Sequence, residues 1–243
     1  HTYITQFVDL DTRNPIFVCE GRDSETFKKF CDWLLAHNGD PSLIEIVAMD
    51  MSGAFTSGCM KYLPNAQIVY DKYHMVQDAN KALDEVRKGE AKEKKMLKGH
   101  RYTLLYLRKN LPKTKLQELD TLLLTYPQLG KAHSLREGLV DILNDATAKT
   151  KGAWDDFNEW MKLATESKLE PFKKLVNTFK SHLFGIETFF EQGNVTNGVL
   201  ESLNSKVQLA KRRARGYTNI NNFVNMIYYV NGGEIFHYPL KTT

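Results

Sequence analysis

The stretch that decides the fold is Leu43-Ile-Glu-Ile-Val-Ala-Met49, which ends directly at Asp50. Its nearly continuous apolar character is typical of a strand buried in a parallel sheet. A short helix capped by Ser52 is expected next, and then a second buried strand, Ala66-Gln-Ile-Val-Tyr70, that ends at Asp71. This alternation of strand and helix predicts an α/β fold.

A hairpin is predicted upstream of that stretch. Tyr3-Ile-Thr-Gln-Phe-Val-Asp-Leu10 and Pro15-Ile-Phe-Val-Cys19 are rich in β-branched and aromatic residues, and the turn-forming segment Asp11-Thr-Arg-Asn14 separates them. A helix that begins with Ser24 as its cap should follow. The predicted order over the first 70 residues is therefore β-β-α-β-α-β.

From Tyr73 to about Glu191 the strand signals vanish and helical periodicity takes over. The expected helices lie near residues 74–97, 99–110, 113–124, 134–148, 150–166 and 168–190. A helix from about Gly198 to Arg215 and another around Asn219–Tyr229 should close the chain. We therefore predict a core in two parts, residues 1–75 and 193–243, with a helical insertion at residues 76–192.

The composition, with 42% hydrophobic and 26% charged residues, is that of a globular protein. No apolar run approaches the ~20 residues that a membrane helix needs, so no membrane partner is expected. Cys19, Cys31 and Cys59 show no CxxC spacing and fit buried thiols in a reducing cytoplasm. Because the chain opens at His1 without a methionine, we expect it to be a piece of a longer protein.

The positive charge is concentrated near the end of the chain. The net charge is only +4, but five basic residues crowd into ten positions with no acidic residue among them: Lys206, Lys211, Arg212, Arg213 and Arg215. A dense basic patch attracts a polyanion, and we expect these side chains to meet DNA phosphates. The alternative is an ordinary solvated helix face.

Two acidic residues, Asp9 and Asp50, stand at the carboxyl ends of predicted strands, where α/β sheets bind ligands. If their strands are parallel neighbours, ~4.8 Å apart, the carboxylates could share a divalent cation such as Mg²⁺ or Mn²⁺. Each residue could instead merely begin a turn, as aspartate often does. Asp11 competes with Asp9 for the first position.

At this point the chain resembles a known family, the bacterial insertion-sequence transposases called ISL-three. The matching stretches are Val8-Asp-Leu-Asp11, Glu20-Gly-Arg22, Ala48-Met-Asp-Met51, Ile68-Val-Tyr-Asp-Lys-Tyr-His-Met-Val76, Asn80 with Ala82-Leu-Asp84, Thr196-Asn-Gly-Val-Leu-Glu-Ser-Leu-Asn-Ser-Lys206 and Lys211-Arg-Arg-Ala-Arg-Gly216. They run from one end of the chain to the other.

The resemblance implies a ribonuclease H-like mixed sheet flanked by helices, with a large all-helical insertion before the last catalytic helix. It implies a DDE triad of Asp9, Asp50 and Glu201 that binds two Mg²⁺ or Mn²⁺ ions and catalyses DNA cleavage and strand transfer. In such folds the strand with the first acid lies beside the strand with the second. A zinc-binding and helix-turn-helix region usually precedes this domain.

Four further residues are expected to support the pocket. Asp71 and His74 form a D-x-x-H pair, which the resemblance marks as a recurrent feature of the catalytic pocket, although both could be ordinary residues of a helix start. Asn197 and Asn204 share roughly one helical face with Glu201, where their amides could bind DNA or orient the carboxylate. The alternative for Asn197 is simple capping.

The expected partners are the terminal inverted repeats of the element, target DNA, and a second copy of the chain in a synaptic homodimer or larger assembly. The expected location is the bacterial cytoplasm, at the nucleoid. Two other functions stay open: a metal-dependent nuclease of the same fold without strand transfer, and an inactive or domesticated transposase that only binds DNA.

Overall fold

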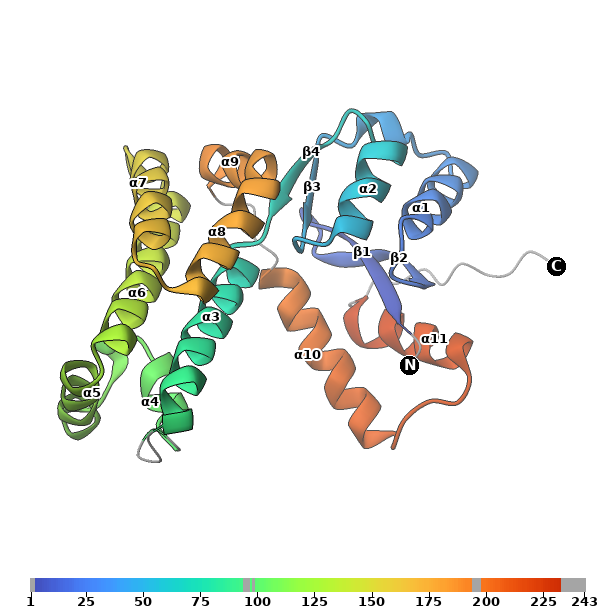
Figure 1. Cartoon of the computed structure of the whole chain (residues 1–243). Helices are drawn as coiled ribbons and strands as arrows, with labels where there is room; N and C mark the ends of the chain where they lie inside the picture. Colours follow the sequence, from blue (N-terminus) through green and yellow to red (C-terminus); the bar gives the residue numbers. More distant parts are fainter. Residues whose placement is uncertain (1–2, 94–96, 98, 194–197, 233–243) are drawn as a thin grey trace. The chain divides into compact units, whose positions relative to one another are not determined.

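The computed structural model describes residues 3–93, 97, 99–193 and 198–232, and for residues 92–93 and 198–201 the backbone alone. The chain divides into two compact units, His1–Ile68 together with Thr196–Thr243, and Val69–Val195 (Figure 1). The dividing line falls inside strand β4 (Gln67–Tyr70). We describe each unit by itself.

The first unit opens with the predicted hairpin. Strands β1 (Ile4–Asp9) and β2 (Asn14–Glu20) pair antiparallel, with a register irregularity between Phe7 and Val8. Arg13 has φ +60 in the connecting turn, a left-handed conformation that such short connections require. The hairpin expected from the alternation of β-branched and aromatic residues is confirmed.

Helix α1 (Glu25–Ala36) covers one face of this hairpin through aromatic packing. The rings of Phe7 and Phe30 stack with centroids 4.3 Å apart. Ser24 occupies the N-cap position as predicted, but its side chain makes no capping hydrogen bond. The Asp23 carboxylate accepts one from the backbone of the first turn instead, at 3.1 Å. The sequence therefore located the helix start and its N-cap residue correctly, but the side-chain hydrogen bond is accepted by Asp23.

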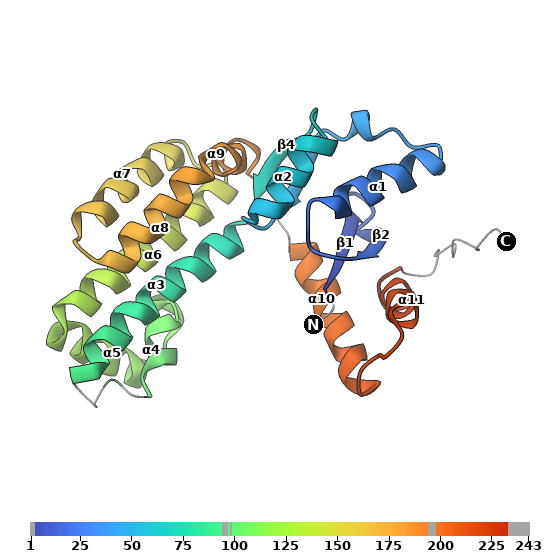
Figure 2. The same cartoon turned by 45° about the vertical axis from the view of Figure 1, so that its right-hand side comes forward.

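Helices α10 (Gly198–Arg213) and α11 (Ile220–Asn231) lie on the other side of the hairpin (Figures 1 and 2). Val18 and Val207 are buried in one cluster with two residues of α11. The backbone N–H of Val18 also donates a buried hydrogen bond of 2.9 Å to the Tyr228 hydroxyl. This bond attaches α11 directly to the backbone of β2.

The strand, helix, strand unit that decides the fold forms, but its first strand begins at Ile46, three residues after the predicted Leu43, which is 76% exposed. It consists of β3 (Ile46–Met49), α2 (Gly53–Tyr62) and β4, and β3 and β4 pair with each other. The Ser52 side chain accepts a hydrogen bond from the backbone of α2, which confirms the predicted cap. A short 3₁₀ turn, Pro41–Leu43, precedes β3.

The described strands form two separate two-stranded sheets, β1 with β2 and β3 with β4. The α/β class and the order β-β-α-β-α-β are confirmed. In the described part of the chain β3 pairs with β4 and not with β1, so the pairing expected between the strands that carry Asp9 and Asp50 is not found. The ribonuclease H-like sheet stays a prediction.

The second unit is helical after its short share of β4. Its helices are α3 (Lys72–Glu93), α4 (Arg101–Leu105), α5 (Lys113–Thr125), α6 (Pro127–Thr147), α7 (Ala153–Glu166), α8 (Glu170–Ser181) and α9 (Leu183–Gln192), with a 3₁₀ turn at Arg108–Asn110. Pro127 begins α6 because proline is favoured in a first turn, so this helix starts seven residues before the predicted 134. The helix expected at 168–190 is divided at His182.

Aromatic side chains fill the core of this helical unit. Phe157, Phe172, Phe179 and Phe189 are fully buried, and Phe157 lies 5.9 Å from Phe179 between ring centroids. The Trp160 indole donates to the Leu135 carbonyl at 2.8 Å, so its polar atom is satisfied. Within the residues described, no helix is long and apolar enough to span a membrane.

Candidate metal centre and nucleic-acid surface

Three side chains gather where β3 and β4 end. Asp50 follows β3 directly, Asp71 follows β4 directly, and His74 lies in the first turn of α3. One ligand atom from each lies within 4.8 Å of the others. The strands also begin side by side, because the Gln67 N–H donates to the Glu45 carbonyl at 2.7 Å. With both their starts and their ends adjacent, the strands run parallel, and their carboxyl ends bring the two aspartates together.

Asp71 is held by the start of α3. Its side chain is 4% exposed, and Oδ1 accepts a hydrogen bond from the Tyr73 N–H at 3.2 Å. His74 Nδ1 lies 3.7 Å from Asp71 Oδ2, which is an ion pair whenever the imidazole is protonated. Both the helix N-terminus and a protonated His74 stabilise a buried carboxylate that burial would otherwise penalise.

Lys72, which lies between Asp71 and His74 in the chain, is directed away from them toward α6. Lys72 Nζ donates to Thr147 Oγ1 at 2.9 Å and to Asn144 Oδ1 at 3.4 Å, both on α6. Burial lowers the pKa of Lys72, while the nearby Asp71 carboxylate acts in the opposite sense. Lys72 therefore ties α3 to α6 inside the helical unit.

The three side chains suit a divalent cation by their chemistry. Two carboxylates and one imidazole are donors that Mn²⁺ accepts, and Mg²⁺ takes the carboxylate oxygens. With metal–oxygen distances of about 2.1 Å, two ligands on opposite sides of one ion are at most about 4.2 Å apart. The observed limit of 4.8 Å is slightly larger, so side-chain rotation that draws the ligands closer would accommodate the ion.

Asp9 lies at the end of β1, where its carboxylate is used in the turn. The two oxygens accept hydrogen bonds from the Asp11 N–H at 3.0 Å and the Thr12 hydroxyl at 2.8 Å. This is the turn role that the sequence left open for Asp9. Among the described residues, the metal-ligand cluster contains neither Asp9 nor Asp11.

The segment Thr196–Lys206, which carries Glu201, lies partly outside the described residues. The backbone of Glu201 is in α10, but its side chain lies outside the described residues, and so does all of Asn197. Asn204 is described, and its Oδ1 accepts a hydrogen bond from Gln6 Nε2 on β1 at 3.0 Å. The sequence reasoning missed Gln6, although a polar residue among the β-branched and aromatic residues of a strand signals a specific polar contact.

All five residues of the predicted DNA-binding patch are exposed: Lys206, Lys211, Arg212, Arg213 and Arg215. Residues 202–231 include these five and no acidic residue. None of the five belongs to an ion pair within the part of the chain that the structure describes. Lys211 Nζ lies 5.4 Å from the Phe223 ring centroid, an aromatic contact that leaves its charge uncompensated. The end of α10 is therefore a cationic surface.

Comparison with known proteins identifies relatives. A family model described as a transposase, of the DDE type and the ISL3 group, matches residues 1–227. The transposase for insertion sequence element IS1001 of Bordetella parapertussis is 29% identical over 226 residues, which are 89% of this chain and 54% of that protein. The transposase for insertion sequence element IS1557 of Mycobacterium tuberculosis (strain CDC 1551 / Oshkosh) is 26% identical with the same coverage of each chain.

The chain thus spans about half the length of the curated relatives that it matches. No solved structure matches it.

Proposed function

Because the chain belongs to the ISL3 family of insertion-sequence transposases, we propose that it carries the catalytic residues of an enzyme that cleaves and rejoins DNA phosphodiesters at the ends of its element. The observation that carries this proposal is the cluster of Asp50, Asp71 and His74 at the carboxyl ends of two parallel strands. Phosphoryl transfer by this class of chemistry needs carboxylates that hold divalent cations beside the scissile phosphate.

In this proposal Asp50 is the principal ligand, since it follows the strand directly and lies beside Asp71. Asp71 and His74 complete the site from the first turn of α3. When bound, a pair of Mg²⁺ or Mn²⁺ ions lowers the pKa of the attacking water or 3′-hydroxyl and stabilises the leaving oxygen. The protein holds the carboxylates in position before DNA binds. The Asp71 side chain, which is 4% exposed, is held most firmly.

The packing of α10 supports Glu201 as the third acid. Val207 shares a buried cluster that Ile4, the first residue of β1, packs against, and Asn204 contacts Gln6 two residues further along that strand. Moving toward the start of α10 therefore means moving toward the end of β1. One more helical turn, about 5 Å, takes the backbone of α10 to Glu201, which is about half of the roughly 10 Å that separates Gln6 from Asp9 along β1.

Asp9 keeps the place of the first acid in the proposal, with Asp11 as the alternative. The two turn hydrogen bonds engage one lone pair of each Asp9 oxygen, and each oxygen has a second. The turn would then orient the carboxylate while leaving acceptor capacity for a cation. Separate substitution of Asp9 and Asp11 distinguishes the two candidates.

We propose that the cationic end of α10 contacts the DNA backbone. Each phosphate that a lysine or arginine neutralises releases counterions, so binding should weaken steeply with salt. The exposed positions of Lys211, Arg212 and Arg213 on the last turn of α10 suit this role. The DNA would include the terminal inverted repeats and the target in the bacterial cytoplasm. Joining two ends calls for a homodimer or a larger assembly.

The test is Mg²⁺-dependent nicking of a duplex that carries the element's end, with the full-length transposase. Asp50→Asn and Glu201→Gln should each reduce the nicking rate by more than about 100-fold, because even outer-shell partners of metal ligands cost about 10–100-fold. Binding of the same duplex in EDTA should persist. The control is Asp32→Asn, which removes an exposed partner of Lys28 on α1 and should leave nicking unchanged.

Equal nicking by Asp50→Asn and wild type would reject the site. Joining of a labelled 3′-end to a plasmid separates a transposase from a nuclease that only cuts. If the wild-type protein binds the duplex but never nicks it with Mg²⁺ or Mn²⁺, the remaining interpretation is a DNA-binding transposase remnant.

A further inference from the structure

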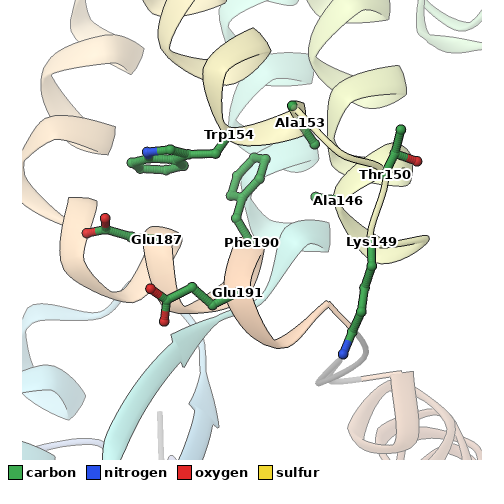
Figure 3. A pocket seen from close by; sticks show the side chains of 9 residues that line it. Ala146, Lys149, Thr150, Ala153, Trp154, Glu187, Phe190 and Glu191 are labelled. Atoms are coloured by element: carbon green, nitrogen blue, oxygen red, sulfur yellow. The ribbon is translucent and has the colours of Figure 1, made fainter.

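A recess of about 280 Å³ lies within the helical unit, between the loop that joins α6 to α7 and helix α9 (Figure 3). None of the residues that line it belongs to the cluster of Asp50, Asp71 and His74. Drug-sized ligands generally occupy pockets of about 300–1,000 Å³. The recess is therefore suited to one amino-acid side chain or a ligand of similar size.

One wall of the recess is aromatic. Trp154 and Phe190 lie with ring centroids 5.2 Å apart in an edge-to-face arrangement, and Trp154 also stacks on the buried Phe157 at 5.8 Å. The Trp154 side chain is half-buried, so these contacts fix the indole while part of it stays accessible. An accessible indole held in this way offers a π surface to a ligand.

The loop between α6 and α7 forms the opposite wall, and its backbone adopts left-handed conformations. Lys149 and Gly152 have φ +56 and +90, and Gly193 at the end of α9 has φ +70. A Cβ added at Gly193 would lie 2.7 Å from Lys149 Cγ, so the loop packs closely against the end of α9. In Figure 3 the Lys149 ammonium points away from Trp154.

The remaining wall is acidic. Glu187 and Glu191 line the recess from α9, one helical turn apart, and both are exposed. Like charges at this spacing destabilise a helix. Within the described residues, neither carboxylate takes part in an ion pair or a side-chain hydrogen bond, whereas Glu159 on the adjacent α7 is paired with Lys162 at 3.2 Å. The two glutamates thus present uncompensated negative charge beside the indole.

This combination selects a cation with an apolar stem. Two carboxylates repel phosphates and other anions, which makes the recess unsuited to a DNA backbone. An arginine side chain matches the aromatic and acidic walls, since its guanidinium stacks on an indole, its donors meet carboxylates, and its methylene stem packs on aromatic carbon. We propose that the recess receives an arginine side chain from another polypeptide, with the guanidinium over Trp154 and between Glu187 and Glu191.

The experiment needs neither metal nor DNA, so its outcome is independent of the proposed nuclease chemistry. The full chain is titrated with N-acetyl-arginine amide while the NMR signal of the Trp154 indole N–H is followed, assigned by Trp154→Phe. The expected result is a saturable shift of that signal. Binding of the neutral isostere N-acetyl-citrulline amide should be about tenfold weaker, because it lacks the positive charge.

The double variant Glu187→Gln with Glu191→Gln should also weaken arginine binding about tenfold, without loss of helical circular dichroism. Its matched control, Glu159→Gln, should bind like wild type. Three results would overturn the proposal: an unmoved Trp154 signal, equal binding of the arginine and citrulline probes, or equal binding by the double variant. Tighter binding of deoxyadenosine monophosphate would assign the recess to a nucleotide instead.

Discussion

Replacing Tyr228 by phenylalanine tests how the closing helix is attached to the hairpin. The substitution keeps the ring and removes the hydroxyl that accepts the buried Val18 N–H at 2.9 Å. Tyr228 is 8% exposed and Val18 is 6% exposed, so water cannot readily replace the lost acceptor. An unsatisfied buried N–H costs about 1–3 kcal/mol. The free energy of unfolding of the first unit should fall by that amount.

The adjacent residue supplies the control. Tyr229 is 85% exposed, so Tyr229→Phe should change the unfolding free energy by less than about 0.5 kcal/mol. Urea denaturation measures both variants, and hydrogen exchange of the Val18 amide reports the bond itself. That amide should exchange faster in Tyr228→Phe and at the wild-type rate in Tyr229→Phe. Unchanged protection of Val18 in Tyr228→Phe would refute the attachment.

Two other stability predictions follow from local geometry. Burial raises the pKa of Asp84, but hydrogen bonds from Lys88 and a neighbouring arginine outweigh it and hold the pKa below its ordinary 3.8. A carboxyl group whose pKa is lower in the folded state stabilises the fold at pH values above its unfolded-state pKa. That stabilisation is lost as the pH falls through the folded-state pKa. In Asp84→Asn, the free energy of unfolding should therefore fall less steeply below about pH 4 in an acid titration. Gly58→Ala would place a Cβ 2.6 Å from the Phe27 ring and should lower the free energy of unfolding in urea by about 1–3 kcal/mol. Gly53→Ala, where the added Cβ has open space around it, should be neutral or stabilising. Equal effects of the two substitutions would contradict the close packing of α1 on α2.

Local sequence patterns predicted the secondary structure of the first unit well. The apolar run before Asp50 and the alternation around the Asp11 turn give strands because their periodicity and turn chemistry agree. The helix breaks were harder to predict. One predicted helix ends at residue 124 and the next begins at 134, whereas Pro127 is the first residue of α6, a position that proline's fixed φ allows.

At the candidate site, the placement of residues after strands could be predicted, but the contacts between distant segments could not. Asp50 and Asp71 each follow an apolar strand, and this placement is what brings them together. The turn role that the sequence left open for Asp9 is the one observed, since the Asp11 N–H and the Thr12 hydroxyl are ordinary turn partners. Gln6 and Asn204 meet across nearly the whole chain length, a pairing that no local pattern encodes.

The metal centre at the ends of β3 and β4 is tested by locating a bound cation. Anomalous diffraction from a crystal of the full-length protein grown with Mn²⁺ locates the ion without reference to activity. We predict a peak within about 2.5 Å of an Asp50 carboxylate oxygen, with Asp71 or His74 beside it. In the wild-type protein, a peak outside ligand distance of both Asp50 and Asp71 would contradict the claim that the ends of β3 and β4 form the metal centre.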